Sequence, residues 1–104
     1  MNREIKFRVW FDNKMHKVVD IDFAYQRINL LGADIIEFKN GKLMQYTGLK
    51  DKNGVEIYEN MIINNKYIVI YNFCKFALKN IENGNITDFK KDGVYEITRE
   101  YFEQ

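Results

Sequence analysis

The strongest constraint on the fold is an alternation of apolar and polar residues near the start of the chain. Apolar residues recur at every second position in 4–11 and again in 18–23: Ile5, Phe7, Val9 and Phe11, then Val19, Ile21 and Phe23. Because successive side chains of a β-strand point to opposite faces, each run predicts a strand with one buried face. The polar residues 12–16 between them predict a loop, and the whole segment an antiparallel hairpin.

Charge favours one register for this hairpin. Pairing position i with position 28 − i places Arg8 opposite Asp20 on the polar face and Phe7 opposite Ile21 on the apolar face. Opposite charges and apolar side chains both stabilise an antiparallel pair when they face each other across it. We therefore expect Phe7 and Ile21 to be buried together.

Turn residues divide the rest of the chain into short apolar segments. Asn or Asp precedes Gly at positions 40–41, 53–54, 83–84 and 92–93, and these residues tolerate the positive φ of tight turns. The apolar segments beside them are 35–38, 43–47, 67–71 and 94–97. Residues 67–71 are apolar on both faces, which predicts a central strand. Thr98 is a candidate N-cap for a short helix through Phe102.

These patterns predict a mainly β protein, α+β at most. We expect a strongly bent antiparallel sheet or a small SH3-like barrel built from hairpins, with at most a short C-terminal helix. A length of 104 residues with 46% hydrophobic residues fits a single domain over 1–104. The lone cysteine, Cys74, predicts a reducing compartment and a buried, inert thiol. The chain shows no apolar run of signal-peptide or membrane-spanning length, so we expect a cytoplasmic protein and no membrane partner.

Two segments resemble the YopX family of phage and prophage proteins. The first is Arg3-Glu4-Ile5-Lys6-Phe7-Arg8-Val9-Trp10, and the second, longer and more specific, is Leu43-Met44-Gln45-Tyr46-Thr47-Gly48-Leu49-Lys50-Asp51-Lys52-Asn53-Gly54-Val55-Glu56-Ile57-Tyr58-Glu59. The resemblance implies a phage or prophage origin in low-GC bacteria, hence the cytoplasm of a bacterial host cell, and implies no particular activity. We call residues 43–59 the hallmark segment.

The chain departs from the family pattern in two places. Asn60 stands where the family usually has Gly, and Asn can adopt the same left-handed conformation, so we expect the turn to survive. The Gly-, Asn- and Tyr-rich C-terminal segment of the family is not apparent after Gly93. A partner surface built there would differ in this chain.

Little in the sequence points to catalysis. We expect that the protein is not an enzyme and that it has no cofactor and no metal site. One His and one Cys cannot form a structural zinc site, and we expect His16 to be a solvated loop residue. Asp20 and Asp22 share a strand face as an acid pair would, but the predicted register pairs them with basic residues.

Candidate partner-binding residues come from two places. Trp10 and Arg8 share the polar face of the first strand, and exposed Trp and Arg are common interface anchors. Turn chemistry accounts for most of the hallmark segment, but its loop could also display Tyr46, Lys50 and Lys52 for binding. Local packing is the alternative for Trp10.

The leading functional hypothesis is a non-enzymatic accessory protein that binds a partner, as a homo-oligomer. One alternative is an antagonist of host defence that blocks a host protein or sequesters a small nucleotide. Another is a single-stranded nucleic-acid binder, because residues 60–81 interleave lysines and aromatic residues without any acid. Near-balanced charge, 16 basic against 15 acidic residues, makes nucleic acid the less favoured partner.

Overall fold

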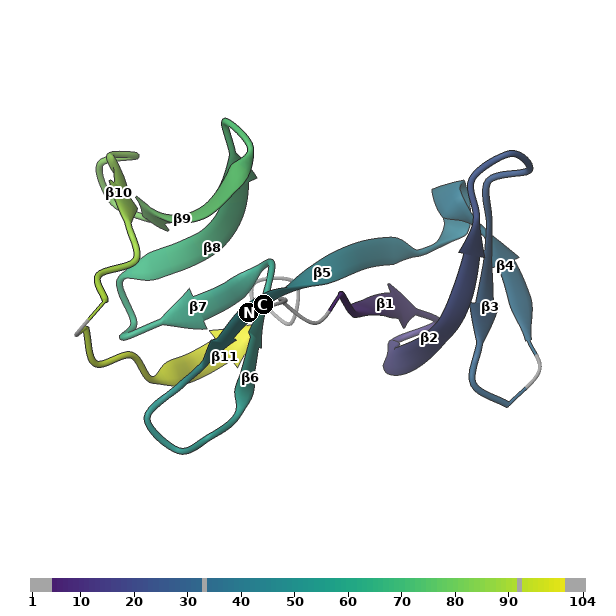
Figure 1. Cartoon of the computed structure of the whole chain (residues 1–104), viewed down its shortest axis with the longest axis horizontal. Coiled ribbons are helices and arrows are strands. Elements are labelled where there is room, and N and C mark those ends of the chain that lie inside the picture. The colour runs from purple at the N-terminus through teal and green to yellow at the C-terminus, as the bar shows by residue number, and fades with distance from the viewer. Residues whose placement is uncertain (1–4, 33, 92, 101–104) are drawn as a thin grey trace. The chain divides into compact units, whose positions relative to one another are not determined.

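A computed structural model describes residues 5–32, 34–91 and 93–100. The described residues form antiparallel strands and one short 3₁₀ helix, which confirms the prediction of a mainly β fold (Figure 1). The elements are β1 (Phe7–Phe11), β2 (Lys14–Asp22), β3 (Arg27–Leu30), β4 (Ile35–Glu37), η1 (Phe38–Asn40), β5 (Lys42–Lys50), β6 (Glu56–Tyr58), β7 (Met61–Ile63), β8 (Tyr67–Asn72), β9 (Lys75–Asn80), β10 (Ile86–Asp88) and β11 (Ile97–Glu100). The chain forms two compact units, unit 1 up to Gln45 and unit 2 from Tyr46 onward.

Unit 1 contains the predicted hairpin, but in a different register. β1 and β2 pair antiparallel, yet Arg8 lies opposite Lys17, three positions before the predicted Asp20. The reason is the turn: Asp12 and Asn13 have φ of 55° and 59°, so they form a two-residue hairpin turn and β2 starts directly after them. The loop predicted over 12–16 is therefore wrong, and the turn decides the register.

An irregularity in β2 explains why its apolar alternation misleads. The pairing with β3 shifts after Val18, which makes Val19 part of a bulge and leaves it 60% exposed. Beyond the bulge, Ile21 lies opposite Ile28 and not opposite Phe7, so the predicted burial of Phe7 against Ile21 is also wrong. The strands of unit 1 lie in the order β4-β3-β2-β1-β5. Their core consists of Val9, Ile28, Leu30 and Ile36, with Phe11, Val18, Phe38 and Leu43 packed around it.

Gly41 serves packing rather than a left-handed turn. Its φ is −137°, an extended conformation, and it follows the 3₁₀ turn η1. A Cβ at this position would lie 2.7 Å from Cδ1 of Ile36 and 2.8 Å from Cγ2 of Val9. The chain turns here, because the amide of Gly41 donates to the carbonyl of Phe38, but the expected positive φ is wrong. Gly54 and Gly84 do adopt positive φ, 81° and 75°. Asp92, in the last predicted turn, lies outside the described residues.

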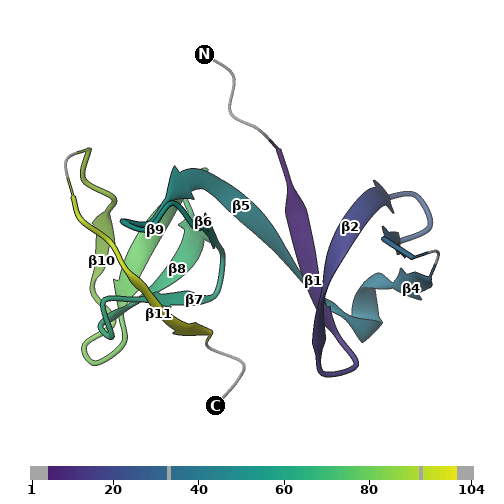
Figure 2. The same cartoon turned by 90° about the horizontal axis from the view of Figure 1, so that it is seen from below.

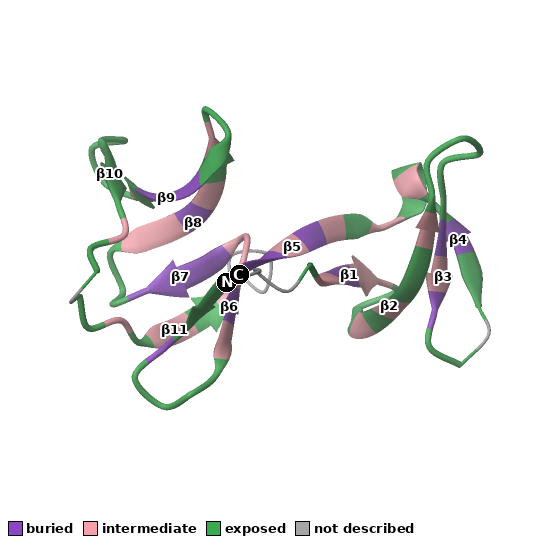
Figure 3. Cartoon of the chain, viewed as in Figure 1, coloured by how far each residue is buried: buried purple, intermediate pink, exposed green. Residues whose placement is uncertain are grey.

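Unit 2 contains a sheet in the order β10-β9-β8-β7-β11, and the second half of β5 pairs with β6. β8 lies between β9 and β7, which confirms the predicted central strand. β7 is buried along its whole length and β10 is exposed (Figure 3). The core consists of Ile57, Met61, Ile63, Val69 and Leu78. β8 and β9 curve strongly (Figure 1), and the described strands form bent open sheets rather than a closed barrel.

The C-terminal segment differs from the prediction. Residues 94–96 form no strand, and β11 begins at Ile97, antiparallel to β7 (Figure 2). Thr98 lies within β11, so the predicted helix is wrong for the described residues. Its hydroxyl donates to the carbonyl of Ile62, 3.1 Å away, which ties β11 to β7 rather than capping a helix. Tyr101 and Phe102 lie outside the described residues.

Candidate functional site

The turn of the hallmark segment is organised by one carboxylate. Oδ1 of Asp51 accepts hydrogen bonds from the backbone nitrogens of Asn53, at 2.8 Å, and Val55, at 2.9 Å. The amide of Gly54 donates to the carbonyl of Asp51, and its positive φ lets the chain reverse there. Asp51 is buried although it is charged, since the turn supplies the donors that a buried carboxylate needs.

The second oxygen of the same carboxylate reaches the C-terminal strand. Oδ2 of Asp51 accepts a hydrogen bond from the backbone nitrogen of Ile97 at 3.3 Å. The pKa of the Asp51 carboxyl is lowered from 3.8, chiefly because the Val55 amide donates to its charged form. Burial opposes this shift, and the amides of Asn53 and Ile97 and the charge of Lys52 add to it.

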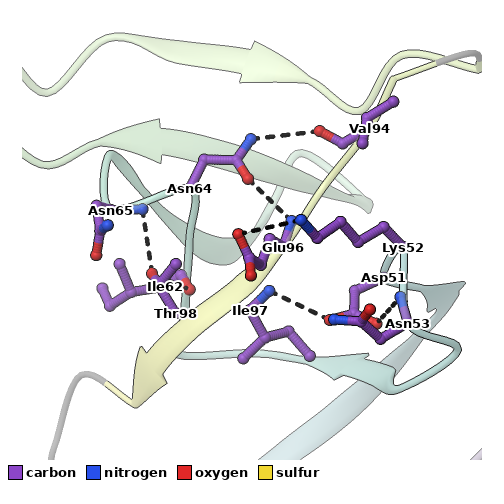
Figure 4. A network of polar contacts seen from close by, with 10 residues as sticks. All are labelled: Asp51, Lys52, Asn53, Ile62, Asn64, Asn65, Val94, Glu96, Ile97 and Thr98. Atoms are coloured by element: carbon purple, nitrogen blue, oxygen red, sulfur yellow. Dashed lines mark hydrogen bonds and ion pairs between the residues drawn. The ribbon is translucent and has the colours of Figure 1, made fainter.

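Lys52 strengthens the same connection (Figure 4). Its backbone nitrogen donates to the carbonyl of Tyr95 at 2.8 Å, and its Nζ lies 3.5 Å from Oε1 of Glu96. Asp51 and Lys52 of the hallmark segment therefore contact three successive residues of the C-terminal segment: Tyr95, Glu96 and Ile97.

The turn between β7 and β8 also forms hydrogen bonds with the C-terminal segment (Figure 4). Oδ1 of Asn64 accepts from the backbone nitrogen of Glu96 at 2.9 Å, and its Nδ2 donates to the carbonyl of Val94. The backbone nitrogen of Asn65 donates to the hydroxyl of Thr98. These contacts join segments about thirty positions apart in the chain.

Other residues in and beside the hallmark segment also have structural contacts. The hydroxyl of Thr47 donates to the carbonyl of Ile57 at 2.8 Å, joining β5 to β6. Asn60 has a φ of 69°, and its amide donates to the carbonyl of Val69 at 3.0 Å. The turn expected at Asn60 therefore survives. These contacts support the interpretation that the segment is specified mainly for folding.

The five candidate binding residues are placed in different surroundings. Arg8 is buried in unit 1, where its guanidinium donates to Sδ of Met44, and Trp10 is half-buried. In unit 2, Tyr46 is buried with its ring centroid 5.4 Å from that of Tyr58, Lys50 is exposed on β5 opposite Glu56, and Lys52 holds Glu96. The role of these five residues in binding stays a prediction. Arg8 and Tyr46 also have contacts within the chain that give each a structural role.

His16 and Cys74 both lie elsewhere than predicted. His16 belongs to strand β2, where its Nε2 lies 3.1 Å from the carbonyl of Phe11. Cys74 is exposed, not buried, because it sits with φ of 65° in the β8–β9 turn beside Phe73. The apolar neighbours of Cys74 suggested a core position, but their alternation is broken by that turn.

The carboxylates of β2 also have partners other than those predicted. The amide of Asn29 donates to Asp20, and the backbone nitrogen of Tyr25 donates to Asp22 at 3.1 Å. The predicted pairing of Asp20 with Arg8 is wrong, since the register places Arg8 opposite Lys17. Among the described residues, no group of three His, Cys, Asp or Glu side chains is arranged to hold a metal ion.

The lysine- and aromatic-rich strands of unit 2 are partly occupied by contacts of their own. Phe76 is buried, and Lys75 forms an ion pair with Asp88 at 2.9 Å. Nζ of Lys66 lies 5.4 Å from the ring centroid of Tyr67. Tyr71 and Phe73 are exposed, and the ring of Tyr71 packs against that of Phe76 with centroids 5.0 Å apart.

The most distinctive surface feature is one that the sequence did not indicate. Six large apolar residues described in unit 1 are each 60–71% exposed: Ile5, Val19, Phe23, Tyr25, Leu31 and Ile35. Leu31 and Ile35 lie at the two sides of the β3–β4 turn, where the amide of Leu30 donates to the carbonyl of Asp34 at 2.8 Å. The bulge at Val19 contributes to this exposure, and the alternation of apolar and polar residues does not reveal it.

Unit 2 contains a hollow of about 540 Å³ on the face of β8 and β9 that points away from its core. It is lined by Ile68, Ile70, Lys79, Asn80, Ile81, Asn83 and Gly84. Ile68 and Lys79 are directly opposite each other across the two strands, so they share this face, while Val69 and Leu78 point into the core.

The structure thus defines a mainly β protein whose hallmark turn has structural contacts and whose surface exposes several apolar residues. The family model of the YopX protein matches residues 6–101, and the chain belongs to the YopX family. No curated protein sequence matches the chain. No helix among the described residues is long and apolar enough to cross a membrane.

Proposed function

We propose that this YopX-family protein acts by binding, without catalysis, and that it works as a homo-oligomer. The observation that supports the proposal most is the exposure of Val19, Phe23, Tyr25, Leu31 and Ile35 in unit 1. Single exposed apolar residues are ordinary, but Val19 and Ile35 also line one hollow of about 420 Å³ on unit 1. Concave surface with apolar lining is typical of a binding site.

The strand order adds a second reason. β4, which contains Ile35, is an end strand of its sheet, and among the described strands it pairs with β3 alone. The outward N–H and C=O groups of an end strand readily pair with another chain. An apolar side chain on such an edge therefore favours association between copies.

The charge of the chain does not oppose association. The formal net charge is +1, which gives little long-range repulsion between copies. The chain also contains no proline, a residue that often blocks strand edges. Both features leave the edge of β4 open to a second copy.

The test is light scattering of the wild-type protein over a dilution series, beside Ile35→Glu. We expect the wild type to be larger than a monomer at high concentration, and Ile35→Glu to shift toward monomer because a charge replaces an apolar contact. Val55→Glu is the matched control, since Val55 is 51% exposed in the hallmark turn of unit 2. A wild type that stays monomeric throughout contradicts the oligomer, and an equal effect of Val55→Glu contradicts its assignment to unit 1.

A further inference from the structure

The β3–β4 connection of unit 1 carries two exposed apolar residues and an exposed acidic residue. Leu31 and Ile35 are 65% and 64% exposed, and Asp34 is exposed between them. The hydrogen bond from Leu30 to the carbonyl of Asp34 holds both sides of the turn together. Asp34 forms no ion pair with any residue that the structure describes. We call Leu31, Asp34 and Ile35 the β3–β4 tip.

The hollow of unit 2 has the complementary composition. Ile68, Ile70 and Ile81 supply its apolar surface, and Lys79 supplies an exposed positive charge. Within the described part of the chain, Lys79 has no ion-pair partner either. Apolar groups beside one unneutralised cation fit a ligand that is apolar with one acidic group.

We propose that the β3–β4 tip of one copy docks into the unit 2 hollow of a second copy. Leu31 and Ile35 would bury their exposed side chains against Ile68 and Ile70, and Asp34 would meet Lys79. This inference rests on the proposed self-association and specifies which surfaces make it. Because the two surfaces differ, two copies either dock reciprocally about a two-fold axis or join head to tail into a ring or an open chain.

The pairing of charges makes the proposal testable by reversal. Asp34→Lys alone places two positive groups together, and Lys79→Glu alone places two negative groups together. Like charges that face each other disfavour the contact, so each single variant should raise the dissociation constant of assembly at least about tenfold. Asp34→Lys combined with Lys79→Glu restores opposite charges and should recover most of the wild-type assembly. An equimolar mixture of the two single variants should also assemble.

The experiment is sedimentation velocity of the wild type, both single variants, their mixture and the double variant, at matched concentration. Lys91→Glu, an exposed lysine of unit 2 outside the hollow, is the charge control and should assemble like the wild type. Circular dichroism confirms that each variant is folded. An oligomeric wild type whose assembly neither single variant weakens overturns the docking but leaves the proposed self-association standing. Weakening by both single variants without recovery in the double variant or the mixture also overturns the docking.

Discussion

The carboxylate of Asp51 lies 3.3 Å from the backbone nitrogen of Ile97, 46 positions further along the chain. The same carboxylate closes its own turn through the amides of Asn53 and Val55. One side chain thus determines both the shape of the hallmark turn and the attachment of the C-terminal strand. The segment that identifies the family therefore has a structural explanation that does not require a ligand.

Replacing Asp51 with Asn should destabilise unit 2. Asn has one acceptor oxygen where the carboxylate has two, and its NH₂ group would face either the turn amides or the amide of Ile97. We expect a lower melting temperature and faster hydrogen exchange at Ile97. Asp12→Asn, in an exposed turn where Asn is equally favoured, is the control and should leave the melting temperature nearly unchanged.

Acid should remove the contribution of Asp51 in a defined pH range. The pKa of its carboxyl is lowered from 3.8 in the folded protein, chiefly by the Val55 amide, so protonation is easier in the unfolded chain. The stabilisation is therefore fully present above 3.8 and is lost as the pH falls through the lowered pKa. The difference in free energy of unfolding between wild type and Asp51→Asn should therefore become smaller as the pH falls below 3.8. A difference that stays constant from neutral pH to strong acid would rule out this linkage.

Asn60 should be replaceable by Gly but not by Ala. Its φ of 69° is left-handed, a conformation that costs an ordinary L-residue about 1–2 kcal/mol. Asn60→Ala should lose stability of that order in urea unfolding. Asn60→Gly keeps the amide that donates to Val69 and should be close to neutral. Equal stability of the two variants would mean that the backbone conformation does not matter here.

Gly41→Ala should destabilise unit 1 by crowding. The new methyl group would lie 2.7 Å from Cδ1 of Ile36 and 2.8 Å from Cγ2 of Val9, and overpacking of this kind costs about 1–3 kcal/mol. Adding Ile36→Val removes one of the crowding atoms, so the double variant should be less destabilised than the sum of the two single variants. Strict additivity in a double-mutant cycle of unfolding free energies would contradict the crowding.

The sequence predicts the elements of this fold better than their registers. Alternation identifies the β1–β2 hairpin, but charge pairing places Arg8 opposite Asp20, whereas the two-residue turn at Asp12 and Asn13 places it opposite Lys17. Turn geometry prevails because it is fixed by two backbone conformations, while cross-strand charge pairs contribute only a fraction of a kcal/mol to about 1 kcal/mol each.

Single-residue environments are harder to predict than strands. The left-handed conformation of Asn60 follows directly from the tolerance of Asn for positive φ. The exposure of Cys74 does not follow from its apolar neighbours, because a turn places its side chain in solvent. The bulge at Val19 adds one residue to a strand and exposes an apolar side chain that alternation would bury. The β3–β4 tip and the unit 2 hollow depend on such details of pairing, so sequence patterns alone do not indicate them.

We propose that the hallmark turn serves folding while self-association uses other surfaces. Hydrogen exchange measured by mass spectrometry, on dilute monomer and on concentrated assembly, distinguishes the two kinds of surface. We predict that assembly slows exchange in peptides covering the β3–β4 turn, Leu30–Glu37, and the end of β9, Lys79–Asn85, and leaves the hallmark turn, Asp51–Val55, unchanged. Slowed exchange confined to Asp51–Val55, with none at the other two segments, would contradict it.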